Sequence, residues 1–256
     1  MKYAVSIPTL GKAREPVLHE TIKAFLEQAC PPDLILIIDN NDKEYPVNLP
    51  AGERVVSARN DYLVPGIIQG DQTGLRMLGL LGYEYVARWD DDLVPRPNCM
   101  ANLIACMKLT DCSAAGGMYP SLNKLGNSHL SDDGKSLVVP DRGQRHFQFY
   151  AWSGKHRYIK RHFLYSSFLY KVRAVQAIGG FCTEYSQHSY RADTDVTLRL
   201  NRFAGPLCVA TDAVADHKFG EGGTRSITSN KKDCMLNHDA ILFGLRMKTL
   251  GIDPNY

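Results

Sequence analysis

The sequence predicts an α/β fold with a central, mostly parallel sheet flanked by helices. Short aliphatic runs alternate with segments of helical spacing, and the first strand, helix and strand are completed within residues 3–38. Such a βαβ unit joins parallel strands by a right-handed crossover and leaves a ligand crevice at their carboxyl ends. Because 256 residues with 44% hydrophobic content can bury a large core and no linker divides the chain, we expect one domain over residues 1–256.

The first half of the chain contains the clearest elements. Residues 3–7 form a short apolar strand, and residues 34–38 form a continuous aliphatic run suited to a central strand. Between them, apolar residues recur at helical spacing until a Pro-Pro pair: Leu18, Ile22, Phe25 and Ala29. Val55-Val56 adds a short strand. A helix over residues 70–81 then leads into a strand over residues 83–87.

The second half is less regular. Residues 121–145 are polar and predict a long excursion or an irregular hairpin, and long loops of this kind often carry binding functions. Val196, Leu200 and Phe203 share one face of a predicted helix that opens near Arg191, and a strand begins at Cys208.

Polar residues follow three of the predicted strands. Thr9, Asp39 and Asp90 each stand at a strand's carboxyl end, and these ends form one edge in an open α/β sheet. We expect a nucleotide to bind along that edge. In the alternative interpretation, Asp39 and Asn40 only make an Asx-type turn.

Three adjacent carboxylates, Asp90, Asp91 and Asp92, follow Trp89. At about 4 Å and an effective dielectric of about 20, each like-charge pair costs about 4 kcal/mol, so the run needs a cation or solvent. Mg²⁺ and Mn²⁺ prefer oxygen ligands and often bridge carboxylates to phosphates. The run therefore indicates a metal site for a phosphorylated substrate. Its alternative is a solvated acidic turn that caps the next helix.

A second acidic motif contains Asp193 and Asp195. At about 100° per residue, Asp193 falls on the face of Val196 and Leu200, so we expect it to point inward and Asp195 to point away. An inward carboxylate in a first helical turn has a structural partner or a catalytic task. The alternative, a capping carboxylate favoured by the helix dipole, fits Asp195 better.

His217 lies at a predicted strand end before a glycine-rich loop, which suggests a further metal ligand, although a lone histidine is more often structural. Gly222 and Gly223 beside Arg225 suit a mobile flap that closes on phosphates, with charge-assisted hydrogen bonds from Arg225. The alternative is an ordinary glycine turn.

The cysteine pattern and the lack of a leader both predict a cytoplasmic protein. No signal peptide is recognisable, and the longest aliphatic run is too short to span a bilayer. The odd number of cysteines, without any CxxC pair, argues against disulfides and zinc and for reduced, buried thiols. They are Cys30, Cys99, Cys106, Cys112, Cys182, Cys208 and Cys234.

Charge is unevenly distributed along the chain. Residues 142–183 contain eight Lys or Arg and no acidic residue, so this basic segment carries +8 while the whole chain carries +3. Such a segment indicates an anionic partner. Aromatic residues alternate with its cations, as a nucleic-acid strand requires for phosphate neutralisation and base stacking.

Taken together, the motifs resemble the family-2 glycosyltransferases of the GT-A fold. The matching elements occur in the family's order over about residues 3–220: Ser6-Ile-Pro-Thr9, Ile37-Ile38-Asp39-Asn40, Asp90-Asp91-Asp92 with Pro95, Gly179-Gly180-Phe181, Asp193-Thr-Asp195-Val-Thr-Leu-Arg199-Leu and His217. The family often has Glu-Asp where this chain has Ala192-Asp193, so the base is either Asp193 or Asp195. The helical face favours Asp193.

The resemblance implies a nucleotide-sugar donor, expected to be a UDP-sugar, and a divalent metal, Mn²⁺ or Mg²⁺. It implies that Thr9, Asp39 and Asn40 contact the base or ribose, that Asp90 and Asp91 approach ribose and metal, and that Asp92 is the principal metal ligand. It also implies that Asp193 is the general base of a transfer with inversion, since aspartate is ionised at neutral pH. Residues 1–97 would then form the donor half, and residues 98–256 the acceptor and catalytic half.

The acceptor stays open. A glycan or lipid-linked glycan, a hydroxymethylated base in DNA flipped out of the helix, and another small acceptor each fit the basic segment. Its aromatic residues can equally be core residues with cations on a solvated face. A nucleotidyltransferase or a non-catalytic sugar-nucleotide-binding protein would share the donor half.

Overall fold

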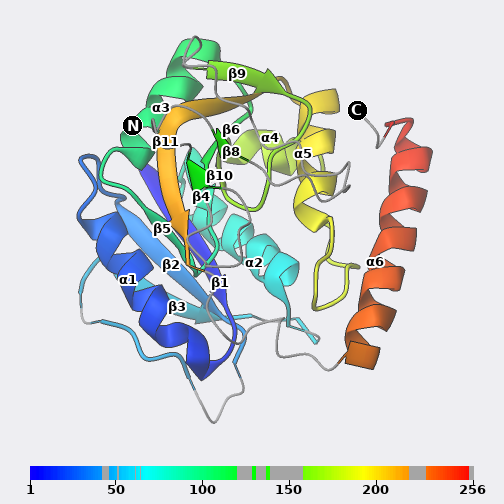
Figure 1. The fold of residues 1–256 in the computed structure, drawn as a ribbon, viewed down its shortest axis with the longest axis horizontal. Coiled ribbons are helices and arrows are strands. Elements are labelled where there is room, and N and C mark those ends of the chain that lie inside the picture. Colours follow the sequence, from blue (N-terminus) through cyan, green and yellow to red (C-terminus); the bar gives the residue numbers. More distant parts are fainter. Residues whose placement is uncertain are drawn as a thin grey trace.

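The structure, a computed structural model, describes residues 1–41, 46–50, 52–60, 62–63, 65–119, 129–130, 137–138, 158–218 and 229–253. Figure 1 shows its elements, which follow one another as β1 (Tyr3–Thr9), η1 (Lys12–Arg14), α1 (Glu15–Leu26), β2 (Leu34–Asp39), β3 (Val55–Arg59), α2 (Ile67–Leu80), β4 (Tyr85–Arg88), β5 (Leu93–Pro95), α3 (Cys99–Thr110), β6 (Ala114–Met118), β7 (His129–Leu130), β8 (Leu137–Val138), β9 (Tyr158–Arg161), β10 (Phe168–Lys171), α4 (Val172–Ala177), α5 (Ala192–Phe203), β11 (Leu207–His217) and α6 (Ser229–Leu250). None of the helices in these ranges is both long enough and apolar enough to cross a membrane.

One large sheet organises the fold, in the order β3-β2-β1-β4-β10-β6-β11-β5, with β9 paired to β11. The pairs β1–β2, β1–β4, β2–β3 and β6–β11 are parallel, whereas β10 runs antiparallel between β4 and β6. β11 is also antiparallel to β5 and β9. The predicted α/β fold with a central sheet is confirmed. The sheet is mixed, because the strands after β4 are not all joined by the crossover helices that parallel pairing requires.

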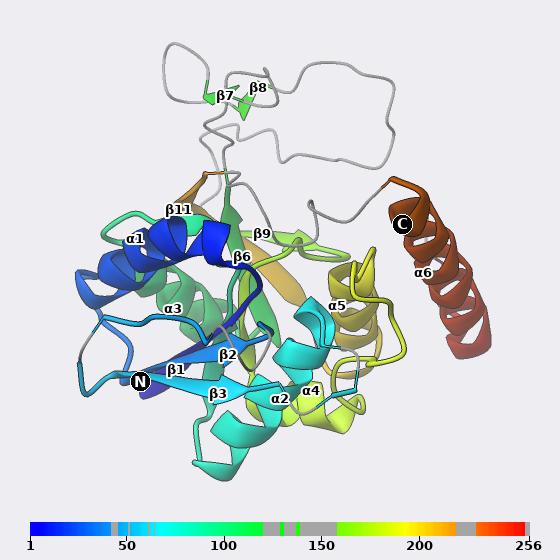
Figure 2. The same cartoon turned by 90° about the horizontal axis from the view of Figure 1, so that it is seen from below.

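Helices cover both faces of the sheet, as Figure 2 shows: α1 and α3 lie on one side, and α2, α4 and α5 on the other. Side chains alternate between these two cores along each central strand. In β2, Ile35 and Ile37 pack on the α1 side, and Leu36 and Ile38 pack on the α2 side. Because both faces are buried, β2 has a continuous aliphatic run and no polar alternation.

Helix α6 lies at the side of the molecule, next to α5 (Figures 1 and 2). Phe243 and Met247 are its buried apolar contacts. Its carboxylate Asp239, fully buried, accepts hydrogen bonds from Ser186 N at 2.7 Å and from Tyr190 N at 2.8 Å. The C-terminal helix is therefore fixed by apolar packing and by a buried carboxylate that binds the loop before α5.

Most elements expected from the first half are observed. The strands expected at 3–7, 34–38, 55–56 and 83–87 correspond to β1, β2, β3 and β4, and the helix expected at 70–81 corresponds to α2. The strand expected to begin at Cys208 is β11, which extends without interruption to His217. The excursion expected over residues 121–145 lies mostly outside the described residues.

Helix α2 approaches β1 closely because two glycines face the strand. A Cβ atom at Gly74 would overlap Ser6 Oγ and lie 3.0 Å from Ser6 Cβ, and one at Gly70 would lie 2.9 Å from Pro8 Cβ. Gly70 and Gly74 stand four residues apart and so share one helical face. The missing side chains allow the helix to lie directly on the strand that carries Thr9.

We expect Gly74→Ala to destabilise the protein by about 1–3 kcal/mol, because the added methyl group has no room. The matched control is Gly244→Ala in α6, where no atom lies within 4 Å of the added carbon. There the higher helix propensity of alanine should stabilise the protein by up to about 1 kcal/mol. Urea unfolding measures both changes. A Gly74→Ala protein as stable as the Gly244→Ala protein would show that α2 does not require this close approach.

Candidate active site

The carboxyl ends of β1, β2 and β4 meet at one edge of the sheet. Thr9 and Asp39 are direct partners in the parallel register of β1 and β2. Thr9 Oγ1 donates a hydrogen bond of 2.8 Å to Asp91 Oδ2, in the turn after β4. The structure therefore brings together the polar strand ends that the sequence places in one crevice.

Asp39 and Asn40 make contacts typical of an Asx turn. Asp39 accepts hydrogen bonds from Asn41 N at 2.9 Å and from Val47 N at 3.0 Å. Asn40 Oδ1 accepts one from Asn60 Nδ2 at 2.6 Å. Both side chains are buried at the edge where donor contacts are predicted. The turn interpretation is therefore observed, and the role of these residues in binding the donor stays a prediction.

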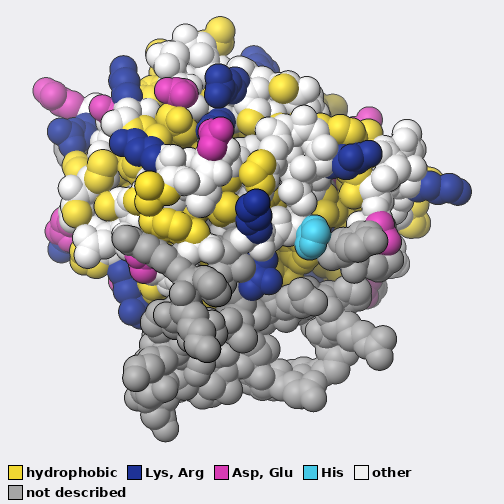
Figure 3. Space-filling model, turned by 90° about the horizontal axis from the view of Figure 1, so that it is seen from above, with side chains coloured by type: hydrophobic (Ala, Val, Ile, Leu, Met, Phe, Trp, Pro, Cys, Tyr) yellow, Lys and Arg dark blue, Asp and Glu magenta, His cyan; other side chains and the backbone are white. Residues whose placement is uncertain are grey.

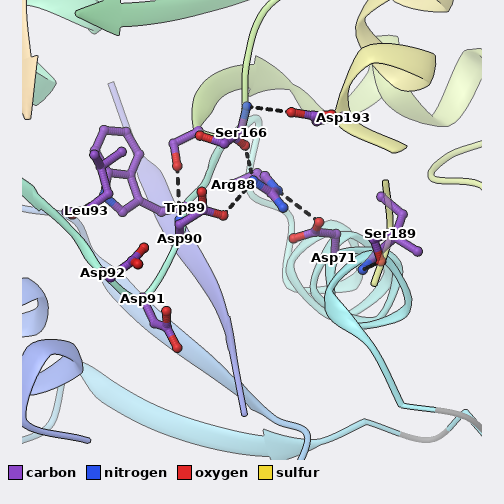
Figure 4. Close-up of polar contacts among 12 residues, drawn as sticks. Asp71, Arg88, Trp89, Asp90, Asp91, Asp92, Leu93, Ser166, Ser189 and Asp193 are labelled. Carbon is purple, nitrogen blue, oxygen red and sulfur yellow. Dashed lines mark hydrogen bonds and ion pairs between the residues drawn. The ribbon is translucent and has the colours of Figure 1, made fainter. Parts of the chain in front are cut away.

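Trp89 precedes the acidic turn, which consists of Asp90, Asp91 and Asp92, and holds its start in place. Its ring is fully buried, packs edge-on against Phe25 at 5.3 Å between centroids, and donates from Nε1 to Leu93 O at 2.6 Å. Because successive side chains of an extended chain point in opposite directions, Arg88 and Asp90 lie on the other side (Figure 4). Burial of one large aromatic ring thus directs Asp90 toward α2 and α5.

Two arginines neutralise the three adjacent aspartates. Arg14, at the end of η1, contacts Asp91 Oδ1 at 2.5 Å and Asp92 Oδ2 at 3.0 Å. Arg88 Nη1 contacts Asp90 Oδ1 at 2.8 Å. The repulsion expected from the sequence is therefore relieved in part by the protein's own cations. Neither arginine was identified from the sequence, although a cation at the end of an apolar strand is a recognisable signal for Arg88.

Burial affects the charges on this side of the site. It raises the pKa of Asp91 to about 6, while Arg14 and the hydrogen bond from Thr9 act in the opposite direction. Burial lowers the pKa of Arg14, but Asp91 and Asp92 outweigh it and raise that pKa above its usual value. Arg14 therefore stays a cation, and the charge on Asp91 depends on it.

Arg88 connects three parts of the fold. Its Nε contacts Asp71 Oδ2 of α2 at 2.9 Å, and its Nη1 donates to the carbonyl oxygen of Ser166 as well as to Asp90. Ser166 N in turn donates to Asp193 Oδ2 at 2.8 Å (Figure 4). Burial opposes the charge of Arg88, yet Asp71, Asp90 and Asp193 together raise its pKa. Burial also raises the pKa of Asp71 to about 6.

The predicted orientation of the α5 carboxylates is wrong. Asp195 is fully buried and binds Arg199, Arg246 at 2.6 Å and Tyr185 at 3.0 Å, whereas Asp193 is partly exposed. Helix α5 is buried on more than one face, because α6 also packs on it and supplies Arg246. Asp193 as the base stays a prediction, now with a different reason: Asp195 is fully buried and held by two guanidinium groups, whereas the carboxylate of Asp193 is partly exposed.

His217, the last residue of β11, lies next to the acidic turn. Antiparallel pairing of β11 with β5 places it opposite Leu93, and His217 Nε2 lies 3.2 Å from Asp92 Oδ1. Two neighbouring ligands of one octahedral ion, each at about 2.1 Å, lie about 3 Å apart, so this pair fits Mg²⁺ or Mn²⁺. Within the described residues, the only three close ligand groups are cysteines. Of the described residues, Asp92 and His217 would therefore be the two ligands.

Several predicted features fall elsewhere. Arg225, with Gly222 and Gly223, lies outside the described residues, as do residues 142–157 of the basic segment.

In the remainder of the basic segment, Phe168 and Tyr170 belong to the core, and Lys171 pairs with Asp111 at 2.6 Å. On the face in Figure 3, the coloured Lys and Arg side chains are scattered among apolar and uncharged ones. The described part of the segment therefore belongs mainly to β9, β10 and α4 of the fold.

Comparisons with solved structures bear on the fold of this chain. No protein-family model matches the sequence, and no curated protein matches it significantly. Among solved structures, GalNAc-T7 with UDP, GalNAc and Mn²⁺ is similar with a TM-score of 0.63 and 14% identity, over 87% of this chain and 45% of that chain. TarS 1–349 of S. aureus is similar with a TM-score of 0.58 and 12% identity, over 94% of this chain and 71% of that one. Its complex with UDP-GlcNAc gives 0.63 and 14%, over 96% and 66%.

These neighbours are GT-A glycosyltransferases, and the likeness shows that this chain has a GT-A glycosyltransferase-like fold. The expected fold is thereby confirmed. The chain spans less than half the length of the GalNAc-T7 chain that it matches.

The ion pair between Arg88 and Asp71 gives a test of the site's framework. We expect Arg88→Met to cost about 3–5 kcal/mol of stability near pH 8, because Asp71 loses its counter-charge in the core. Loss of Arg88 raises the pKa of Asp71 further above about 6. A carboxyl group whose pKa is raised by folding binds its proton more tightly in the folded state, so the variant's stability should fall as the pH rises from about 4 to 8.

Urea unfolding across this pH range measures the effect. The control is the double variant Asp71→Asn with Arg88→Met, which should recover much of the stability and lose the added pH dependence. Equal pH profiles for the single and double variants would contradict the pairing of Arg88 with Asp71.

Proposed function

We propose that the protein is a metal-dependent, inverting glycosyltransferase that moves a hexosyl or pentosyl group from a nucleotide diphosphate to an acceptor hydroxyl. The observation that supports this most strongly is the meeting of Thr9, Asp39 and the acidic turn at one sheet edge of a GT-A fold. A UDP-sugar is the proposed donor, because two of the similar structures were solved with UDP or UDP-GlcNAc.

The carboxyl ends of β1, β2 and β4 form the donor side of the proposed site. Thr9, Asp39 and Asn40 are assigned to the base or ribose, and Asp90 and Asp91 to ribose and the surroundings of the metal. In an open α/β sheet this edge is where a nucleotide binds. Asp92 and His217 would hold Mn²⁺ or Mg²⁺, which supplies stabilisation of the charge on the leaving diphosphate. Arg225 is assigned to the phosphates.

Asp193 is assigned as the general base. Its Oδ2 accepts from Ser166 N and its Oδ1 accepts from Thr194 N, each at 2.8 Å, so the carboxylate is held in place and stays partly exposed. It would take the proton of the acceptor hydroxyl as that oxygen attacks the anomeric carbon and the diphosphate leaves. One base in a single displacement inverts the anomeric configuration.

The framework around Arg88 supports this division of roles. Arg88 binds Asp90 on the donor side and the carbonyl oxygen of Ser166, whose N–H holds Asp193 on the acceptor side. Donor and acceptor carboxylates are thereby fixed relative to each other, and such preorganisation lowers the cost of reaching the transition state.

A glycan or a lipid-linked glycan is the proposed acceptor. Of the aromatic residues predicted to stack on bases, Phe163 and Tyr165 are half-buried and pack edge-on against each other at 5.2 Å between ring centroids, so the described part of the basic segment gives DNA no particular support. Two other classes of protein would use the site differently. A nucleotidyltransferase would not need Asp193. A non-catalytic sugar-nucleotide-binding protein would need neither Asp193 nor a metal, because it catalyses no reaction.

Substitution of the two key carboxylates tests the enzyme proposal. We expect Asp193→Asn to lower kcat by about 10²–10⁴ with little change in donor binding, because only the proton acceptor is lost. Asp92→Asn should abolish metal-dependent donor binding. Asp111→Asn is the control, since Asp111 is 94% exposed and belongs to the ion pair with Lys171. Sugar transfer is measured alongside circular dichroism. Full activity in both site variants would rule out the proposed mechanism.

Metal removal and a donor panel test the donor side. With Mn²⁺ present, one UDP-sugar should raise Tm and be slowly hydrolysed, and EDTA should remove both effects until metal is restored. UDP-sugars are compared with other nucleotide sugars at equal concentrations. A donor that binds equally well in EDTA would contradict the metal role of Asp92 and His217. Whether the protein is a glycosyltransferase would then be decided by the activity of the Asp193→Asn variant.

A further inference from the structure

Three cysteines gather in the core, away from the candidate active site. The Sγ atoms of Cys106, Cys112 and Cys208 all lie within 4.8 Å of one another, and the residues are at most 1% exposed. Within the described residues this is the only set of three metal-ligating side chains at such distances. Sequence spacing did not indicate it, because Cys208 is far from the other two along the chain.

The fold explains why these residues meet. Cys106 lies in the last turn of α3, and Cys112 lies in the short link between α3 and β6. Helix α3 packs against β11, and β6 pairs with β11 so that Cys208 stands opposite Ala115. The Cys112 thiol also donates to Met107 Sδ at 3.4 Å, which adds a fourth sulfur atom. Three thiols thus lie together between α3 and the sheet, and the Met107 sulfur lies beside one of them.

We propose that Cys106, Cys112 and Cys208 form a binding site for a thiophilic divalent cation, for which Zn²⁺ is the biological candidate. Zn–S bonds of about 2.3 Å place the sulfurs of a tetrahedral site about 3.8 Å apart. Sulfurs already within 4.8 Å reach this spacing by shifts of about 1 Å or less, which rotation about χ1 provides. Thiolate and thioether ligands prefer Zn²⁺ or Cu⁺ over the hard cations Mg²⁺ and Mn²⁺.

Charge favours a divalent ion at this site. Three thiolates with one divalent cation leave a single net negative charge in the core, and a monovalent cation would leave two. Lys160 of β9 is the backbone partner of Cys208. Its positive charge acts on Cys208 and offsets part of the remaining negative charge.

The cysteine site would stabilise the fold, and it would be separate from the pair Asp92 and His217. Cys208 precedes His217 by nine residues of β11, or up to about 30 Å at about 3.3 Å per residue. A bound ion would link the end of α3 to the start of β11. Because the sulfurs are buried, the ion would enter as the chain folds, and its binding would add to folding stability.

The test refolds the full chain under reducing conditions with one equivalent of Co²⁺, a spectroscopic substitute for Zn²⁺. We expect one bound Co²⁺ with thiolate-to-metal charge-transfer absorption in the near ultraviolet, displaced by Zn²⁺ and not by Mn²⁺. Refolding with Zn²⁺ should also raise Tm relative to metal-free refolding. Cys106→Ala, Cys112→Ala and Cys208→Ala should each lose the absorption and the zinc-dependent rise in Tm.

Cys99→Ala is the matched control, because Cys99 is equally buried and outside the cluster, and it should retain both signals. The wild-type result alone decides the question if a cluster variant fails to fold. Refolded wild-type protein that holds no metal after desalting, or that forms a disulfide among these cysteines, would overturn the proposal. Sugar transfer is not part of the readout, so the result is independent of the proposed enzyme function.

Discussion

The buried guanidinium of Arg88 is the interaction on which the candidate site depends. It has three carboxylates around it, Asp71 from α2, Asp90 after β4 and Asp193 at the start of α5, and it also binds the carbonyl of Ser166. Loss of this cation would leave the buried carboxylate of Asp71 without its counter-charge in a medium of low dielectric. Helix, strand and loop are therefore positioned together.

The acidic turn has two sides because two arginines share it. Arg88 holds Asp90 toward α5, and Arg14 holds Asp91 and Asp92 toward β1 and β11. The burial of Trp89 fixes which carboxylate goes to which side. Without internal cations, three adjacent carboxylates would stay close only in the presence of bound ions or water. With them, the chain itself forms the turn, and the proposed divalent ion would add to the pair Asp92 and His217.

How much of the structure can be predicted from the sequence depends on how far apart along the chain the interacting residues lie. β2 could be predicted because a strand buried on both faces has to be aliphatic throughout. The meeting of Thr9 with the acidic turn follows from parallel strands sharing one edge. The orientation of Asp195 could not be predicted, because its partner Arg246 lies on α6, whose position beside α5 is not encoded in the periodicity of α5. The same limit applies to Arg14 and to Cys208, whose partners come from distant segments.

The mixed character of the sheet is itself what completes the site. A parallel strand next to β4 would present its own carboxyl end at the edge where the acidic turn lies. β10 is antiparallel instead, so Phe168 stands opposite Arg88 and the residues that precede β10 lie beside Asp90. Ser167 Oγ consequently accepts from Asp90 N at 3.0 Å, and Ser166 bridges Arg88 to Asp193. The reversal of strand direction between β4 and β10 thus joins the carboxylates of the acidic turn to the carboxylate of α5, which no purely parallel arrangement of these strands would do.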